Sequence, residues 1–408
     1  MLATLTLFLL HAFSAELTAE PSGELRIEIS APDARGPLYL AGTFNQWNPG
    51  AAAWRLKQIV PANSEAINQQ PTTWVIEVAK EKLSHSPIEF KITRGSWQTV
   101  EVNADLSDID NRTLTAEDLL SPLKLKVAAW ADDRSETRAE KGTVTGKLDV
   151  FDFASKRLKN SRKIRVWLPP GYSDTANAER SYPVLYMHDG QNLFDKNTSF
   201  MGAEWKADET ATKLIQSKKI PPFIIVGIDN TGARGAEYNP PFTYQGDVAN
   251  IGDRYLDFIL SELMPAIAIR YRIATGPENT SLGGSSYGGN ITLYALLRHP
   301  EVFGQVIVES PAILAFGGAL LDRYLANPNW PQRMFVACGT RESKNESVQK
   351  HYTSRIEALR RTFAKQKIPA TRVRLIEEDG ALHNETAWAR RLPAALEFLF
   401  GKKNPDEG

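Results

Sequence analysis

The stretch that decides the fold is Leu282-Gly283-Gly284-Ser285-Ser286-Tyr287-Gly288-Gly289-Asn290. Within it, Gly284-x-Ser286-x-Gly288 is the pattern that holds a serine hydroxyl on a tight corner between a strand and a helix. Such a corner crowds the neighbouring backbone, so small residues two positions before and after the serine relieve the clash. The backbone N–H of Tyr287 then points to where an oxyanion would form, and the dipole of the following helix adds positive potential. The pattern therefore predicts a serine nucleophile for acyl transfer.

The residues on either side of this motif have the spacing that a strand-turn-helix corner requires. Upstream, apolar residues recur at helical intervals over 256–267, and a short segment leads from there into the motif. Downstream, the apolar run 291–298 predicts a helix that ends at His299 and Pro300. Ser286 therefore lies where a nucleophile elbow belongs.

The length and charge of the chain narrow the classes of partner. At 408 residues the chain is long enough for two domains. Lys plus Arg (48) equals Asp plus Glu (48) and no local basic run is present, so we expect neither nucleic acid nor anionic lipid as a partner. The one cysteine, Cys338, lies in an apolar run and is expected to pack in the core. No Cys/His cluster has metal-ligand spacing, so we expect no metal and no other cofactor.

The first residues have the features of a secretory signal. An apolar run from Leu5 to Leu10 is followed by small residues, with Ser14 and Ala15 as the expected cleavage site. No Lys or Arg precedes the run, so a disordered start of the chain is the alternative. No transmembrane segment follows in the sequence. We expect residues 1–15 to be a signal peptide and the protein to be secreted or periplasmic.

Two different patterns divide the rest of the chain. Over 23–125, short alternating strands separated by turn residues predict an all-β sandwich. The charged and weakly apolar stretch 126–142 predicts a linker. Over 143–402, unbroken apolar strands alternate with helical stretches, which predicts a largely parallel sheet buried on both faces. This is the architecture of an α/β-hydrolase, with strands predicted at 164–168, 182–187, 223–228, 306–309, 334–338 and 371–376.

The base that would activate Ser286 must be one of six histidines. Four of them lie in the signal, in the β-rich half or on helices, and are expected to have solvent-side or capping roles: His11, His85, His299 and His351. His383 follows the last predicted strand, and hydrolases of this fold carry the base on the loop there. We therefore expect His383 to be the general base.

The sixth histidine, His188, belongs to the loop 186–195 after an early strand. The fold places a second oxyanion-hole N–H in this loop, near Gly190 or Gln191, to complement the N–H of Tyr287. We expect His188 itself to hold the loop by hydrogen bonds, with a contact to substrate as the alternative. Arg234 and Tyr238, in the loop 230–248, are further candidates for substrate contact.

The acid that orients His383 should follow the serine in the chain and stand at the end of a strand. Glu342 fits, because it comes four residues after Cys338 at the end of a predicted strand. Three other carboxylates lie close to His383 in sequence and are expected to help start a helix: Glu377, Glu378 and Asp379. The alternative for Glu342 is a solvated loop carboxylate paired with Arg341.

These residues and their surroundings resemble the esterase-D-like α/β-hydrolases, a group that includes feruloyl, acetylxylan and enterochelin esterases and S-formylglutathione hydrolases. The resemblance runs from 166 to 388 and rests on Val166-Trp167-Leu168-Pro169-Pro170-Gly171-Tyr172, the run 185–195, the run 226–234, the elbow, Gly339-Thr340-x-Glu342 and His383-x-Glu385-x-x-Trp388. It implies the triad Ser286, Glu342 and His383. Many relatives carry Asp where Glu342 stands.

The β-rich half resembles the immunoglobulin-like modules that bind starch and glycogen, through Ala41-Gly42-Thr43-Phe44-Asn45-Gln46-Trp47-Asn48, the run 90–97 and Asn111-Arg112-Thr113. Sugar rings lie with flat C–H faces against indole, and a lysine fixes hydroxyls, so the resemblance implies Trp47, Lys91 and Trp97 as candidates for glycan contact. The alternative is a packed extension in which the tryptophans cover core or a seam between domains.

Together these features predict a serine carboxylic-ester hydrolase with a carbohydrate-module-like domain. By analogy, the substrate would be a feruloyl or acetyl ester on plant polysaccharide. The alternative is a siderophore or other small ester, in which case the β-rich half would form a wall of the active site and bind no glycan. A hypothesis of another class is a catalytically silent glycan-binding protein.

Overall fold

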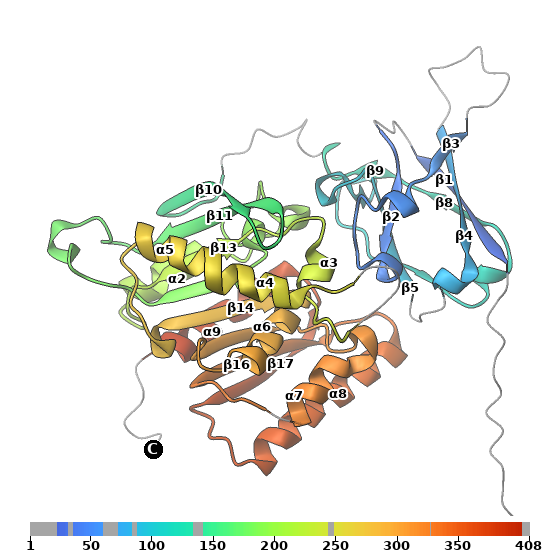
Figure 1. The fold of residues 1–408 in the computed structure, drawn as a ribbon. Coiled ribbons are helices and arrows are strands. Elements are labelled where there is room, and N and C mark those ends of the chain that lie inside the picture. The colour runs from blue at the N-terminus through green and yellow to red at the C-terminus, as the bar shows by residue number, and fades with distance from the viewer. Residues whose placement is uncertain are drawn as a thin grey trace, which may run out of the picture.

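The computed structural model describes residues 23–31, 36–59, 72–83, 88–133, 142–243, 249–326 and 328–401. The signal predicted at 1–15 lies outside the described residues, as does much of the predicted linker. The strands fall into two groups that follow one another in the chain, a β-rich module and a larger α/β domain (Figure 1).

The β-rich module is built from small sheets around a shared core. One sheet has the order β3-β4-β1-β8, a second has the order β2-β5-β7, and β6 pairs with β9. Apolar residues of β1, β4 and β5, including Ile27, Ile76 and Phe90, face each other in one cluster. The bounds of the strands are β1 (Glu24–Ala31), β2 (Tyr39–Gly42), β3 (Lys57–Ile59), β4 (Thr72–Ala79), β5 (Ile88–Thr93), β6 (Glu101–Val102), β7 (Arg112–Leu114), β8 (Leu123–Lys126) and β9 (Ala129–Trp130).

The module continues past residue 125, where the sequence predicted it to end. Trp130 on β9 is only 1% exposed and belongs to the core of the module. The predicted linker therefore overlaps a strand. Outside Val127 and Trp130, the stretch 126–133 holds only alanines and charged residues, and two large buried side chains are too few to give a strand pattern in the sequence.

The α/β domain contains one sheet of eight strands in the order β10-β11-β13-β12-β14-β15-β16-β17. The strands from β13 to β17 along this order are parallel, while β10 and β11 are antiparallel additions at one edge. This is the α/β-hydrolase fold predicted from the sequence. The bounds are β10 (Lys147–Ser155), β11 (Asn160–Leu168), β12 (Val184–His188), β13 (Ile224–Ile228), β14 (Thr280–Ser285), β15 (Gln305–Glu309), β16 (Arg333–Arg341) and β17 (Val373–Leu382).

Helices cover both faces of this sheet, which explains why its strands are apolar without alternation. On β12, Val184 and Tyr186 point into the core on one face, and Leu185 and Met187 into the core on the other. Helices α2 and α9 pack on the second face, and α4, α5, α6 and α7 on the first. The bounds are α2 (Ala207–Gln216), α3 (Arg234–Glu237), α4 (Gly252–Phe258), α5 (Met264–Arg270), α6 (Tyr287–Arg298), α7 (Ala319–Ala326), α8 (Glu346–Lys365) and α9 (Glu385–Phe400).

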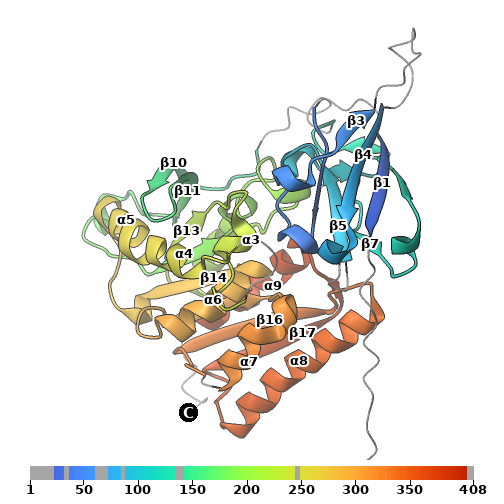
Figure 2. The same ribbon diagram turned by 45° about the vertical axis from the view of Figure 1, so that its right-hand side comes forward.

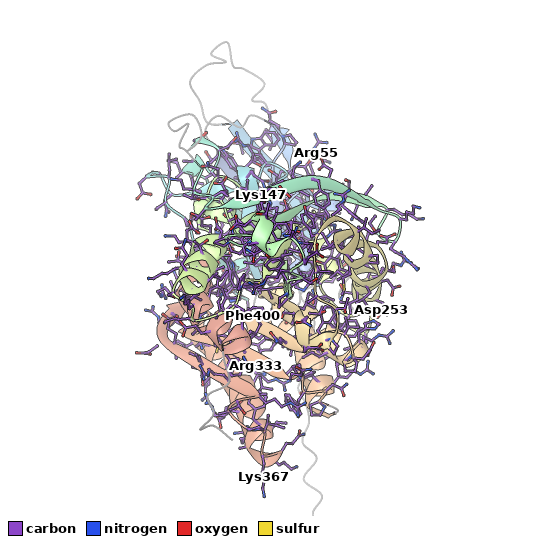
Figure 3. All side chains as sticks on the ribbon, turned by 90° about the vertical axis from the view of Figure 1, so that its left-hand side faces the viewer. Arg55, Lys147, Asp253, Arg333, Lys367 and Phe400 are labelled. Atoms are coloured by element: carbon purple, nitrogen blue, oxygen red, sulfur yellow. The ribbon has the colours of Figure 1, made fainter. Side chains whose placement is uncertain are left out.

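The last helix, α9, runs back across the sheet from the carboxyl ends of the strands. Its end is fixed by Arg333, the first residue of β16, whose Nη1 donates to the carbonyls of Phe398 (2.7 Å), Leu399 (2.9 Å) and Gly401 (3.1 Å). Figure 3 labels Arg333 and Phe400 where β16 begins and α9 ends. The start of α9, directly after His383, therefore lies at the opposite edge of the sheet, where the strands end.

Among the described residues, no helix is both long and apolar enough to cross a membrane. Within the same part of the chain, no three His, Cys, Asp or Glu side chains are grouped so that they could hold a metal ion.

Candidate active site

Ser286 stands on a strained corner between β14 and α6. Its backbone angles are φ 56° and ψ −122°, outside the regions that residues with a side chain normally adopt. A Cβ on Gly284 would lie 3.0 Å from the Cβ of His188, and one on Gly288 3.3 Å from the same atom. The two glycines of the motif are therefore needed because His188 fills the space beneath the corner.

The corner is tied to the neighbouring strand through the backbone. The N–H of Ser286 donates to the carbonyl of Glu309, the last residue of β15, at 3.0 Å. The carbonyl of Ser286 accepts from the N–H of Ala312 at 3.2 Å. Two bonds from one neighbouring segment thus hold the strained residue.

His383 and Glu342 form a hydrogen-bonded pair. The Nδ1 atom of His383 lies 2.6 Å from Oε2 of Glu342, whose side chain is almost fully buried. The other carboxylate oxygen accepts from the hydroxyl of Ser310 (2.7 Å) and from the N–H of Gly339. The structure thus places the predicted base and acid in contact. The three other carboxylates have other partners. Glu377 pairs with Arg360, Glu378 pairs with Arg390 and Arg391, and Asp379 accepts from the hydroxyl of Thr340.

The pair shifts the pKa of both partners. Burial by itself would raise the pKa of Glu342, but the hydrogen bond and charge of His383, with the Gly339 N–H and the Ser310 hydroxyl, hold it below its usual value. Burial would lower the pKa of His383, but the hydrogen bond to Glu342, the charge of Glu342 and the carboxylates of Glu385 and Glu89 raise it above its usual value. The carboxylate therefore stabilises the imidazolium.

The sheet brings these residues to one edge. β14, β15, β16 and β17 are consecutive parallel neighbours, and Ser286, Ser310, Glu342 and His383 each follow the end of one of them. Hydrogen bonds tie neighbouring strand ends together. The N–H of Ser286 donates to the carbonyl of Glu309, the hydroxyl of Ser310 donates to Glu342, and Nδ1 of His383 donates to Glu342. Ser310 has φ 39°, which turns the chain sharply at the end of β15.

Trp388 of α9 supports the same group. Its indole Nε1 donates to the hydroxyl of Ser310 at 2.9 Å, and its ring meets that of His383 edge to face at 5.2 Å. Arg391, one turn further along the helix, forms a buried ion pair with Glu309 at 2.5 Å. Helix α9, which follows His383, therefore supports the imidazole through the ring of Trp388.

The predicted oxyanion loop lies beside the corner. After β12 the chain makes a short 3-10 turn over Gly190–Asn192, preceded by Asp189 with φ 57°. A Cβ on Gly190 would lie 2.5 Å from the carbonyl carbon of Gly227, so only glycine fits there. Oδ2 of Asp189 lies 3.6 Å from the position of a Cβ on Gly288, which places the turn against the first turn of α6. The turn that carries Gly190 and Gln191 therefore lies next to the start of α6, where Tyr287 stands.

Two of the predicted substrate contacts are buried. His188 is 1% exposed, its Nδ1 lies 3.0 Å from the hydroxyl of Tyr255, and burial lowers its pKa to about 3. Tyr238 is 0% exposed, and its hydroxyl accepts from the N–H of Asp189 at 3.3 Å. The burial of Tyr238 contradicts the prediction that it touches substrate, and the burial of His188 excludes the alternative of substrate contact and agrees with the expected role of holding the loop. Both side chains hold the loop from below, because the helices that cover this face of the sheet close over them.

Arg234, the third predicted contact, is only partly buried. Its guanidinium donates to both oxygens of Asp189 at 2.7 and 2.8 Å and lies 5.6 Å from the centre of the Tyr287 ring. Asn230 donates to the same carboxylate at 2.6 Å. Asp189 thus holds the loop in place through Arg234 and Asn230. The sequence analysis included Asp189 in a motif but did not assign it this role.

Glu385 is a further acidic residue that sequence reasoning did not assign. It is the first residue of α9 and 8% exposed, and it accepts a hydrogen bond from Nδ2 of Asn192 at 3.3 Å. Burial raises its pKa to about 7. The motif His383-x-Glu385 was the signal that could have directed attention to it.

The predicted glycan-binding residues of the module have different environments. The Nζ of Lys91 donates to the carbonyl of Ile109, and the residue is only 6% exposed, so Lys91 is corrected to a structural role inside the module. Trp47 and Trp97 are half-buried, with ring centres 6.3 Å apart. Trp97 meets Phe200 of the α/β domain edge to face at 5.5 Å. The two tryptophans thus lie at the seam between domain and module.

Comparison with known proteins identifies relatives of the α/β domain. The model of the Esterase family matches residues 155–399. The "Uncharacterized protein YbbA" of Bacillus subtilis is 24% identical, over 61% of this chain and 96% of its own. An "Endo-1,4-beta-xylanase/feruloyl esterase" of Xylanibacter ruminicola is 26% identical over 62% of this chain, and an "Iron(III) enterobactin esterase" of Dickeya dadantii is 30% identical over 40%. The matched parts span only 31% and 33% of these last two proteins.

Proposed function

Because this chain belongs to the Esterase family, we propose that it hydrolyses feruloyl or acetyl esters of plant saccharides through an acyl-enzyme formed on Ser286. The family makes the chain a carboxylic ester hydrolase. Two observations support the mechanism: Ser286 stands on the strained corner at the end of β14, and the hydrogen-bonded pair of His383 and Glu342 lies at the same edge of the sheet. The choice of acyl group is supported by the feruloyl esterase among the relatives.

In the proposed reaction, the hydroxyl oxygen of Ser286 attacks the ester carbonyl carbon while its proton passes to Nε2 of His383. The N–H groups of Tyr287 and of the Gly190–Gln191 turn hold the oxygen that becomes negative. The alcohol then leaves with the proton from His383. Water, deprotonated by His383, attacks the acyl-enzyme, and the acid is released from Ser286.

Replacing the nucleophile tests this mechanism directly. Ser286→Ala is expected to abolish hydrolysis of p-nitrophenyl acetate while the protein keeps its fold, and the exposed Ser217→Ala serves as a matched control. A fluorophosphonate probe should label the native chain and not the Ser286→Ala variant. Turnover by Ser286→Ala would remove Ser286 from the mechanism. An unlabelled native chain that still retains polysaccharide in a pull-down would favour a glycan-binding protein without activity.

A siderophore or another small ester is the second candidate substrate. Two observations favour it: the enterobactin esterase among the relatives, and the position of Trp97 against Phe200, which suits a module that forms part of the active-site wall. The rates on methyl ferulate and acetylated xylan, compared with the rate on a catecholate trilactone, separate the two candidates.

For the module we propose an immunoglobulin-like sandwich, supported by its two larger sheets around one core. Trp47 and Trp97 remain candidates for contact with the sugar of a substrate. Loss of xylan retention in Trp97→Ala would support that role, and unchanged retention would contradict it.

A further inference from the structure

Among the described residues, the β-rich module contacts three separate segments of the α/β domain. Trp97 packs on Phe200, Asp110 forms an ion pair with Lys344, and Gln46 lies against Gly235 of α3. The contact at Gly235 is so close that a Cβ there would lie 2.5 Å from both the Cβ and the carbonyl oxygen of Gln46. In Figure 1 and in Figure 2, α3 lies on the side of the α/β domain that faces the module.

Each of these segments also holds part of the candidate active site. The N–H of Phe200 donates to Oδ1 of Asn192 in the oxyanion turn at 2.9 Å. Gly235 follows Arg234, which binds Asp189 through both carboxylate oxygens. Lys344 follows Glu342 by two residues. The module is therefore seated on segments that also hold the candidate active site.

One acidic side chain of the module lies on the side that meets the segment of Glu342. Glu89 on β5 is half-buried and accepts from Nδ2 of Asn111 at 3.1 Å, and Asp110, the residue before Asn111, forms the ion pair with Lys344, two residues after Glu342. The charge of Glu89 is also among those that raise the pKa of His383. Glu89 thus brings a negative charge from the module to the edge of the site.

The charges around the base are mostly negative. Glu89, Glu342 and Glu385 all raise the pKa of His383. The guanidinium of Arg234 is held by Asp189 through two hydrogen bonds, and Lys344 is paired with Asp110 of the module. A negatively charged substrate would therefore approach carboxylates, while Arg234 and Lys344 are already paired.

We propose that the β-rich module is a fixed wall of the active site and that Glu89, on this wall, makes the enzyme prefer uncharged esters to anionic ones. Trp97 and Phe200 form an aromatic edge of the same wall, where the ring of a neutral aryl or hydroxycinnamoyl ester packs. This inference rests on the proposed ester hydrolysis and deepens it. It argues against a polyanionic ferric siderophore as the substrate.

A matched pair of glycine substitutions tests the wall. Gly235→Ala adds a methyl group that must displace Gln46, whereas a Cβ on Gly232, in the same loop, would meet only Oδ1 of Asn48 at 3.9 Å. Neither glycine has a positive φ, so alanine itself is not strained at either position. We expect Gly235→Ala to lower the ratio of kcat/KM for methyl ferulate to that for p-nitrophenyl acetate about tenfold, because the wall moves. Gly232→Ala should keep the native ratio. An unchanged ratio in Gly235→Ala would contradict the proposal that the module is a fixed wall of the active site.

A matched pair of substrates tests the charge. Mono-p-nitrophenyl succinate and p-nitrophenyl butyrate have acyl chains of similar length, but only the succinate ester carries a terminal carboxylate. We expect the native enzyme to prefer the butyrate, and Glu89→Gln to raise the succinate-to-butyrate ratio of kcat/KM about threefold at low salt, and less at high salt. The acid limb of the pH profile should also move to lower pH in Glu89→Gln, which a merely structural residue would not cause. Glu24→Gln, on an exposed position of β1, is the control.

The outcomes separate this inference from the proposed function. If Ser286→Ala still hydrolyses the butyrate ester, the proposed mechanism fails. If the native enzyme requires Ser286 but Glu89→Gln keeps both the native substrate ratio and the native pH profile, only the role of Glu89 fails.

Discussion

Replacing Glu342 by glutamine removes one charge from the pair that orients the base. The carboxylate accepts from three donors: Nδ1 of His383 at 2.6 Å, the hydroxyl of Ser310 at 2.7 Å and the N–H of Gly339. A glutamine amide has one oxygen and one NH₂ group. Whichever way the amide is turned, its NH₂ group faces either His383 or the N–H of Gly339, so one donor meets another donor.

The expected loss is large because the wrong tautomer of His383 becomes favoured. In serine hydrolase triads, an equivalent carboxamide substitution lowers kcat about 10⁴-fold, and we expect a similar effect here. The pH profile changes as well. The neutral imidazole is the active form, and its raised pKa means that native activity falls as the pH drops through a value above about 6.5. Without the Glu342 charge, this acid limb should move to lower pH.

The assay is p-nitrophenyl acetate hydrolysis from pH 5 to pH 9, with thermal unfolding measured in parallel. Glu377→Gln is the control, because Glu377 pairs with Arg360 and not with the imidazole. A Glu342→Gln variant that keeps more than a tenth of the native kcat, with its acid limb unmoved, would refute the assignment of Glu342 as the acid.

Three further substitutions test the surroundings of the triad. Ser310→Ala leaves the indole N–H of Trp388 without its acceptor and should lower the free energy of unfolding by about 2 kcal/mol; an unchanged denaturation midpoint would contradict this. Glu385 has its pKa raised to about 7, so its contribution to stability is present below the unfolded value near 4.5 and lost as pH rises through 7. Glu385→Gln should therefore exceed the native protein in stability by about 3 kcal/mol at pH 8 and match it at pH 4, and equal stabilities at pH 8 would count against the burial argument. Gly190→Ala should lower kcat about 100-fold, since the methyl group would lie 2.5 Å from the carbonyl carbon of Gly227 and displace the oxyanion turn; a native kcat would show that the turn tolerates it.

Local patterns in the sequence were sufficient to predict most strands of the large sheet, though not β10 at its edge, and the positions of the site residues along it. Unbroken apolar strands and a glycine-flanked serine are local signals, and the order of strands in the chain then limits which histidine and which carboxylate can follow. This is why His383 and Glu342 could be named from the sequence, and the structure places them 2.6 Å apart.

The remaining features depend on contacts between segments that are distant in the chain. Ser310 has no motif around it, and its importance appears only when β15 and β16 lie side by side. Tyr238 was a candidate for substrate contact because it lies in the loop 230–248, and substrate contact was the alternative for His188, but the helices over the sheet bury both side chains. Lys91 was a candidate for glycan contact because of its place in a motif, but its ammonium group donates a hydrogen bond to a carbonyl of its own module. Side-chain direction, which decides all these cases, is not encoded in spacing alone.

The close fit between Gly235 and Gln46 limits how the two parts of this protein can be exchanged. A hydrolase domain with any larger residue at the position of Gly235 would hold a grafted module away from its surface. Engineers who wish to add this module to another esterase would therefore need to introduce glycine on the acceptor helix first. The same requirement offers a simple criterion for choosing acceptor enzymes.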